Sequence, residues 1–115
     1  MATDPIPPGT LHLLILKTLD VGSEMHGFEI ADAIERVSGE VLTVEEGSLY
    51  PALQRMLLKG WVTGTWGTTE GNRRARYYKL TAAGRRQLAR ELEQFDRVTG
   101  AIVRVIRATH ATPAT

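Results

Sequence analysis

The chain has 115 residues and a formal net charge of +1, and 43% of its residues are hydrophobic and 23% charged. This length and composition indicate one globular domain, of a size at which small domains often gain stability by pairing. The absence of cysteine excludes disulfides, thiolate catalysis, zinc fingers and iron–sulfur clusters. No stretch resembles a signal peptide or a membrane span, so a cytoplasmic protein without membrane contact is expected.

Charge is segregated along the chain. Between residues 20 and 46 there is one basic residue, Arg36, and there are eight acidic residues. The acidic residues are Asp20, Glu24, Glu29, Asp32, Glu35, Glu40, Glu45 and Glu46. Between residues 55 and 90 there is one acidic residue, Glu70, and there are nine basic residues. The basic residues are Arg55, Lys59, Arg73, Arg74, Arg76, Lys79, Arg85, Arg86 and Arg90. This asymmetry favours a polyanion partner for the basic half, and two differently charged solvated faces are the alternative.

Three helices are predicted in the first half, after a flexible tail over residues 1–8 that contains three prolines. Gly9 and Thr10 open the first helix, whose inner face comprises Leu11, Leu14, Ile15, Thr18 and Leu19. Leu13 and Leu16 make this helix apolar nearly all round, so it is expected to pack on its own domain and on a partner. The second helix follows residues 25–28 and ends at Gly39. Its expected core residues are Phe28, Ile30, Ala31 and Ile34.

The third helix begins near residue 43 and ends at Gly60. Thr43 and Glu46 have the spacing of a capping box, although Pro51 implies either a distorted first turn or a cap at Ser48. The apolar face comprises Leu49, Leu53, Met56 and Leu57. Near the N-terminus the helix presents a polar edge, as helices that read DNA do. That edge comprises Ser48, Tyr50, Gln54 and Arg55.

Residues 61–66 and 75–80 are rich in strand-favouring side chains and flank a polar turn. A β-hairpin with a basic tip after a helix-turn-helix unit is a wing.

Thr81 then caps a last helix over residues 81–109, about 40 Å long. Its apolar residues follow coiled-coil spacing, and its seam is expected to pair with a second chain. The seam comprises Leu88, Leu92, Phe95, Thr99, Ile102 and Ile106. A flexible tail is predicted over residues 110–115.

An ordered series of motifs resembles the PadR family of bacterial transcriptional regulators, over about residues 9–92. The motifs are Gly9-Thr10-Leu11 with Leu14-Ile15-Leu16, His26-Gly27-Phe28, Glu46-Gly47-Ser48-Leu49-Tyr50-Pro51-Ala52-Leu53, Gly60-Trp61, Arg73-Arg74-Ala75-Arg76-Tyr77-Tyr78 and Leu80-Thr81-Ala82-Ala83-Gly84. The single closing helix is similar to that of the short-tailed subgroup.

The resemblance implies an α+β, mainly helical winged helix-turn-helix domain over residues 9–80, with a dimerisation helix over residues 81–109. It also implies a homodimeric repressor that binds a palindromic DNA operator and is often released by a small molecule. The dimer interface is expected to include Leu11, Leu14, Leu88, Leu92, Phe95, Ile102 and Ile106. An apolar effector would fit a cavity between the long helices, although only Phe95 is aromatic on the last helix, which argues against sandwiching of flat drugs.

The expected DNA contacts are Ser48, Tyr50, Gln54, Arg55 and Lys59 on the third helix and Arg73, Arg74 and Arg76 on the wing. Gln54 and Arg55 have the donor geometry for adenine and guanine edges, whereas Lys59 suits a phosphate or solvent. Arg74 and Arg76 share one strand face and Tyr77 points away; a solvated tip is the alternative to phosphate contact. For Tyr50 the alternative is packing on the wing. Arg85 and Arg86 suit either the DNA backbone or the dimer.

Other functions have weaker support. Trp61 and Trp66 would anchor the hairpin more readily than they would stack on a ligand. His12 and His26 have no third ligand at metal-binding spacing, so no metal or cofactor is expected, and His26 suits the start of the second helix. The sequence shows neither a nucleophile paired with a base nor a phosphate-binding loop, so it does not indicate an enzyme. The remaining alternative is a winged-helix module whose acidic second helix binds a protein.

Overall fold

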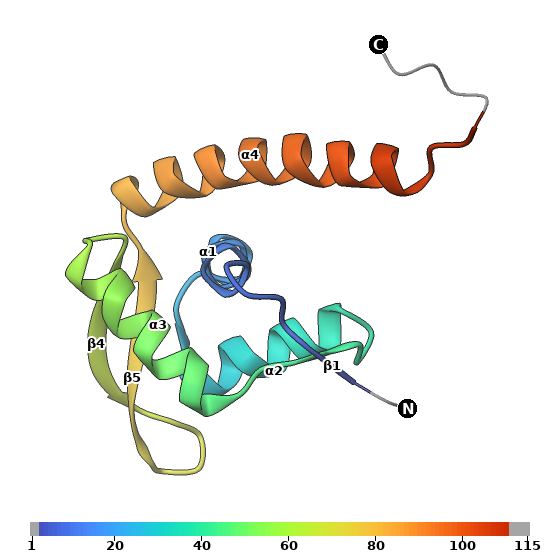
Figure 1. Ribbon diagram of the computed structural model, residues 1–115. Helices are drawn as coiled ribbons and strands as arrows, with labels where there is room; N and C mark the ends of the chain where they lie inside the picture. The colour runs from blue at the N-terminus through green and yellow to red at the C-terminus, as the bar shows by residue number, and fades with distance from the viewer. Residues whose placement is uncertain (1–2, 111–115) are drawn as a thin grey trace.

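The computed structural model describes residues 3–110 (Figure 1). Its elements are β1 (Asp4–Pro5), α1 (Leu11–Gly22), β2 (Met25–His26), α2 (Gly27–Val37), β3 (Leu42–Thr43), α3 (Glu46–Leu58), β4 (Val62–Thr68), β5 (Arg74–Leu80) and α4 (Ala82–Ile106). This is the expected winged helix-turn-helix with a long C-terminal helix, so the predicted fold class is confirmed.

Two small sheets are present in the described residues. β4 and β5 form the predicted antiparallel hairpin, with Val62 opposite Leu80 and Thr68 opposite Arg74, and β2 adds a third strand beside β5. β1 pairs in parallel with β3. The tail predicted over residues 1–8 is therefore partly ordered, because its Asp4 N–H donates to the Val41 carbonyl at 2.7 Å.

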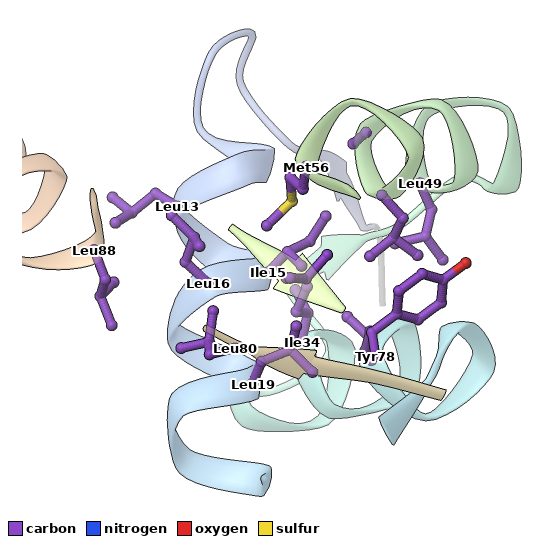
Figure 2. Close-up of a cluster of buried hydrophobic side chains, with 14 residues drawn as sticks. Leu13, Ile15, Leu16, Leu19, Ile34, Leu49, Met56, Tyr78, Leu80 and Leu88 are labelled. Carbon is purple, nitrogen blue, oxygen red and sulfur yellow. The ribbon is translucent and has the colours of Figure 1, made fainter. Parts of the chain in front are cut away.

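The core surrounds α1, which packs against α2, α3, α4 and β5 (Figure 2). Its largest fully buried side chains are Ile15, Leu16, Leu19, Ile30, Leu49, Leu53 and Met56. The strands add Val62, Tyr78 and Leu80, and α4 adds Leu88. Burying these apolar side chains is the main favourable contribution to folding. The expected inner face of α1 is rotated, because Leu13 and Leu16 are buried while Leu11, Leu14 and Thr18 are only partly covered.

The core face of α2 differs from the prediction at Phe28, and Ala33 is buried whereas the predicted Ala31 is only partly buried. Phe28 is 73% exposed, whereas Gly27, Ile30, Ala33 and Ile34 are buried. In an α-helix each residue is turned by about 100° from the last, and Phe28 lies on the side away from Ile30. The assignment of Phe28 to the core was wrong.

The predicted capping box of α3 is also absent. Thr43 belongs to β3, and Glu45 is the N-cap residue without a side-chain capping bond. Instead, the carboxylate of Glu35 reaches from α2 and accepts a hydrogen bond from the N–H of Val44 at 3.0 Å. Pro51 lies inside α3 and deprives the carbonyl of Gly47 of its helical donor. Gly47 is exposed, so water can hydrate that carbonyl.

The predicted cap of α4 is confirmed. The Thr81 hydroxyl accepts a hydrogen bond from the Gly84 N–H at 3.0 Å and donates one to the Gly60 carbonyl at 2.6 Å. α4 runs through Gly100 and ends at Ile106, three residues before the predicted end. Most of the tail predicted over residues 110–115 lies outside the described residues.

The second half of α4 extends beyond the rest of the domain (Figure 1). Among the residues of α4, only Gly84 and Leu88 are buried, and both lie in its first two turns. Across residues 3–110, none of the helices combines the length and the apolar character that crossing a bilayer would require.

Candidate nucleic-acid interface

The third helix presents a polar outer surface. α3 buries Leu49, Ala52, Leu53 and Met56 and leaves all five predicted contact residues exposed. The exposed residues are Ser48, Tyr50, Gln54, Arg55 and Lys59. Because α2 precedes α3 through a short connection, these two helices form the predicted helix-turn-helix unit.

The four residues Ser48, Tyr50, Gln54 and Arg55 do not form the single short edge that was expected. Ser48 and Arg55 lie on one flank of α3 and line a pocket shared with the N-terminal segment. Tyr50 lies on the opposite flank and lines a groove shared with the hairpin. Gln54 lies between the two flanks, since at helical spacing it is about 100° from Arg55 and 40° from Tyr50. These residues therefore form a polar band across the outer face of α3, which is interrupted by the exposed Pro51 and Leu58.

The pocket beside the N-terminal segment has a volume of about 430 Å³ and is lined by Pro7, His12, Ser48 and Arg55, among others. Burial lowers the pKa of His12 below its usual 6.5, and the positive charges of Arg55 and Lys59 lower it further. The carboxylate of Glu91 on α4 acts in the opposite direction and raises the pKa. The lowered pKa favours a neutral imidazole at the centre of this flank.

Tyr50 packs on the first residue of α2. A Cβ atom added to Gly27 would lie 2.7 Å from Cε1 and 2.8 Å from the hydroxyl oxygen of Tyr50. The aromatic ring is nevertheless 46% exposed and faces the groove. Tyr50 therefore packs on the start of α2 and shares its groove with Tyr77 and Tyr78 of the wing.

The wing carries the three predicted arginines. Arg73 and Arg74 are exposed and Arg76 is partly buried. The Cζ atoms of Arg74 and Arg76 lie 4.5 Å and 5.9 Å from the ring centroid of Trp66, so the two arginines share one strand face as predicted. Tyr77 lies on the other face, where its ring meets His26 edge-on at 5.3 Å.

A groove of about 1020 Å³ separates the wing from the start of α3. Figure 1 shows the tip of the hairpin beside the first turns of that helix. Arginines 73, 74 and 76 line the wing side, while Glu46 and Glu29 line the helical side. An anionic strand is attracted by the wing and repelled by the acidic side, which restricts how it can approach.

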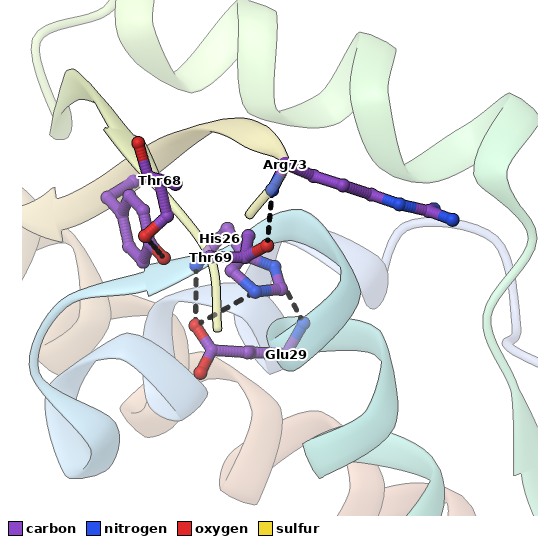
Figure 3. Close-up of polar contacts among 6 residues, drawn as sticks. His26, Glu29, Thr68, Thr69 and Arg73 are labelled. Atoms are coloured by element: carbon purple, nitrogen blue, oxygen red, sulfur yellow. Dashed lines mark hydrogen bonds and ion pairs between the residues drawn. The ribbon is translucent and has the colours of Figure 1, made fainter. Parts of the chain in front are cut away.

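His26 has the structural role that was predicted for it (Figure 3). Its Nδ1 accepts a hydrogen bond from the Glu29 N–H at 3.4 Å, and Glu29 Oε1 accepts one from the His26 N–H at 3.0 Å. The hairpin turn beside it is closed by the Thr69 hydroxyl, which accepts from the Arg73 N–H at 3.2 Å. Within residues 3–110, no three His, Asp or Glu side chains gather as a metal site would require.

The two tryptophans differ. Trp61 is partly buried against the core, with the Lys59 ammonium 4.8 Å from its ring centroid, so it anchors the hairpin as expected. Trp66 is 57% exposed and carries arginines on its ring, so anchoring does not describe it. No sequence pattern indicated this stacking in advance.

The residues predicted for a dimer interface fall into two groups. Leu88 is buried in the chain's own core, and Leu11, Leu14 and Leu92 are partly buried against it. The exposed ones are Phe95, Ile102 and Ile106, which are 42%, 52% and 74% exposed. Val98, Val103 and Val105 widen this exposed apolar face of α4.

Comparison with known proteins gives consistent results. A family model described as the transcriptional regulator PadR-like family matches residues 15–90. An uncharacterized 37.1 kDa protein in transposon TN4556 of Streptomyces fradiae is 40% identical over 90 residues, which cover 78% of this chain and 24% of that protein. This chain thus spans about a quarter of the length of that relative.

Two solved structures are similar in fold. A transcriptional regulator from Clostridium thermocellum has a TM-score of 0.77 and 24% identity, covering 86% of this chain and 95% of that chain. Bacillus subtilis PadR in complex with operator DNA has a TM-score of 0.64 and 21% identity, covering 95% of this chain and 53% of that chain. At these identities the two structures support the fold alone.

Proposed function

Because this chain belongs to the PadR-like family of transcriptional regulators, we propose that it is a homodimeric repressor that binds a palindromic DNA operator through α3 and the wing. Its membership makes it a DNA-binding regulator and not an enzyme. The proposal adds the contacting residues, the dimer and the direction of regulation.

One observation carries the proposal: Tyr50, at one edge of the polar band of α3, and the arginines of the wing line the same groove. Gln54 lies on the outer face of α3, where its amide can pair with an adenine edge in the major groove. Arg73 and Arg74 lie on the hairpin, where they can neutralise phosphates or enter the minor groove. Helix and wing would thus contact neighbouring parts of one duplex.

The exposed face of α4 supports the homodimer. Phe95, Ile102 and Ile106 are apolar, are spaced for a helical seam and are not covered by any other element between residues 3 and 110. In a two-fold dimer, two α3 helices that enter successive major grooves lie about 34 Å apart. Such an arrangement requires an inverted repeat in the operator.

Release by an apolar effector is the third part of the proposal. A molecule bound between the long helices of a dimer would change the spacing of the two wings only if it preferred one spacing over the other. α4 carries no tryptophan, so aliphatic or small aromatic compounds fit this surface better than large flat ones. Effector screening follows once an operator duplex is known.

Titration of the protein against labelled duplex from upstream of its own gene tests the proposal. Fluorescence anisotropy at several salt concentrations is compared with a scrambled duplex of equal length. We expect nanomolar binding of two chains per operator, which the scrambled duplex does not match. With about six phosphates neutralised, log K should fall with log salt with a slope near −5.

A second candidate, a protein-interaction module, is favoured by one feature, the exposed Phe28 on the acidic α2. Equal, weak binding to both duplexes that vanishes with salt would contradict the repressor and favour this candidate. Repression itself is checked with a reporter gene behind the operator, whose expression should fall when the regulator is supplied.

A further inference from the structure

A cluster at the middle of the hairpin combines Trp66, Gly64, Arg74 and Arg76, and we call it the tryptophan shelf. Trp66 lies opposite Arg76 in the β4–β5 register, and Gly64 lies opposite Tyr78. The guanidinium of Arg74 lies 4.5 Å from the ring centroid of Trp66, and that of Arg76 lies 5.9 Å from it. Both distances are within the range of cation–π attraction.

Gly64 provides the space in which Arg76 lies along the hairpin. A Cβ atom added to Gly64 would be 2.5 Å from Nε and 3.2 Å from Cζ of Arg76. Any other residue would therefore displace the guanidinium from β4. Gly64 does not have the positive φ found at Gly9, Gly39 and Gly60, so its value lies in this close approach and not in backbone freedom.

Arg76 gives up solvation to occupy this position. Its Nε is buried and has no hydrogen-bond partner within the described residues. Leaving a buried donor unpaired costs free energy, so such groups in native proteins call for an explanation, a functional one among them. The same side chain lines the groove that separates the wing from α3.

We propose that Trp66 is a positioning residue, which holds Arg74 and Arg76 at the orientation in which the wing binds the DNA backbone. This inference rests on the proposed function. A free arginine loses side-chain entropy when a phosphate fixes it. The tryptophan shelf restricts the two guanidinium groups before DNA arrives, so less entropy is lost on binding.

The experiment is the anisotropy titration with variants that keep every charge. Trp66→Leu removes the aromatic face, and Gly64→Ala displaces Arg76 from β4. Each should weaken operator binding about three- to tenfold, as expected for cation–π contacts at partly exposed sites. The salt slope should stay within error of the wild-type value, because the number of cations is unchanged.

Two variants serve as controls. Trp66→Phe keeps a ring face and should recover most of the affinity. Gly71→Ala adds the same methyl group at the hairpin tip, where the nearest atom is the Thr69 hydroxyl oxygen at 3.8 Å, and should bind like wild type. Thermal unfolding of every variant identifies any that lose the fold.

A double-mutant cycle separates positioning from direct contact. If Trp66 acts through the arginines, Trp66→Leu should have almost no further effect once Arg74 and Arg76 are both alanine. If its loss persists in that background, Trp66 contacts the DNA itself and the inference is overturned.

The spectrum of the free protein gives a readout that needs no DNA. The Nε–H proton of Arg76 should be shifted by the ring current of Trp66, and this shift should disappear in Trp66→Leu. A wild-type protein that binds no duplex would overturn the proposed function and this inference together. A wild-type protein that binds its operator while both shelf variants bind equally well would overturn this inference alone.

Discussion

At the scale of single residues, Phe28 and Ile30 show how position on α2 decides the contribution to stability. Phe28 is 73% exposed, whereas Ile30 is fully buried. We expect Ile30→Ala to lower the free energy of unfolding by about 2–5 kcal/mol, because it leaves a cavity. Phe28→Ala should cost about 0.5 kcal/mol or less. Urea unfolding at one fixed protein concentration measures both, and equal losses would place Phe28 in the core.

His12 provides a second prediction, on electrostatics. Burial is the largest cause of its lowered pKa, and Arg55 lowers the pKa further while Glu91 raises it. Arg55→Ala should therefore raise the pKa of His12, and Glu91→Gln should lower it. An NMR titration of the imidazole protons measures each value. An unchanged pKa in Arg55→Ala would mean that the guanidinium does not lie near the imidazole.

The same shift links His12 to the pH dependence of stability. The unfolded chain has the usual His pKa of 6.5, so below that pH it binds more protons at this site than the folded chain. The stability that depends on neutral His12 is present above pH 6.5 and is lost as the pH falls through the lowered pKa. Replacing His12 with Gln should flatten the unfolding free energy across this window, and an undiminished slope would contradict the assignment.

Sequence reasoning at this scale succeeded where local chemistry decides. His26 was assigned to the start of α2, and the bonds with Glu29 are local. The assignment of Phe28 to the core was wrong because an aromatic residue at the edge of an amphipathic helix fits either face. The stacking of Arg74 on Trp66 could not be found, since it depends on the register of two strands and not on spacing in one.

At the scale of elements, two glycines of α4 have opposite roles. A methyl group at Gly84 would overlap the backbone carbonyl oxygen of Trp61, whereas one at Gly100 meets only Arg104 Nη1 at 3.6 Å. Gly84→Ala should destabilise the protein by about 1–3 kcal/mol, because the helix must move away from the hairpin. Gly100→Ala should stabilise the helix by about 1 kcal/mol. Thermal unfolding compares them, and two shifts of the same sign would contradict the packing.

The helix and the wing should differ in what they contribute to DNA binding. Arg74→Ala removes a proposed phosphate contact, so it should weaken binding to every duplex and reduce the salt slope by about 1. Gln54→Ala should leave the slope unchanged and relax preference at one base pair, at a cost of about 1–3 kcal/mol. Arg36→Ala, which removes an exposed arginine from the far end of α2, is the matched control. Unchanged binding by Arg74→Ala would exclude the wing from the interface.

Long periodic elements were predictable and short ones were not. The hairpin and α4 each extend over enough residues for their periods to be read, and Thr81 marks the start of α4. β1 and β3 have two residues each, so their pairing depends on tertiary contacts. The predicted capping box failed for the same reason, because Thr43 pairs in β3 and the N-cap residue of α3 is Glu45.

At the scale of the whole molecule, the domain is more extended than its length requires. Its radius of gyration is 16.9 Å and its longest extent is 61 Å. A compact domain of this size has a radius of gyration of about 13 Å. The excess comes from α4, whose 25 residues span about 38 Å. The buried residues of this helix, Gly84 and Leu88, both lie in its first two turns.

We predict that a second copy of the chain covers the exposed apolar face of α4. Ile102→Glu places a carboxylate in the exposed apolar seam, where pairing would desolvate it, so the dimer should dissociate at concentrations at which the wild type is paired. Ala89→Glu adds the same charge at an exposed position about 140° away around α4 and should leave the dimer intact. Sedimentation equilibrium measures the mass of each variant.

The consequence for DNA follows from the proposed two-fold symmetry of the operator. A monomer contacts one half-site, so Ile102→Glu should lose most of its affinity for the full inverted repeat and bind a single half-site as weakly as the wild type does. The variant should keep its thermal transition, because Ile102 is 52% exposed and contributes little to the core of one chain. A monomeric wild type, or an Ile102→Glu dimer with unchanged operator affinity, would show that α4 does not join the two chains.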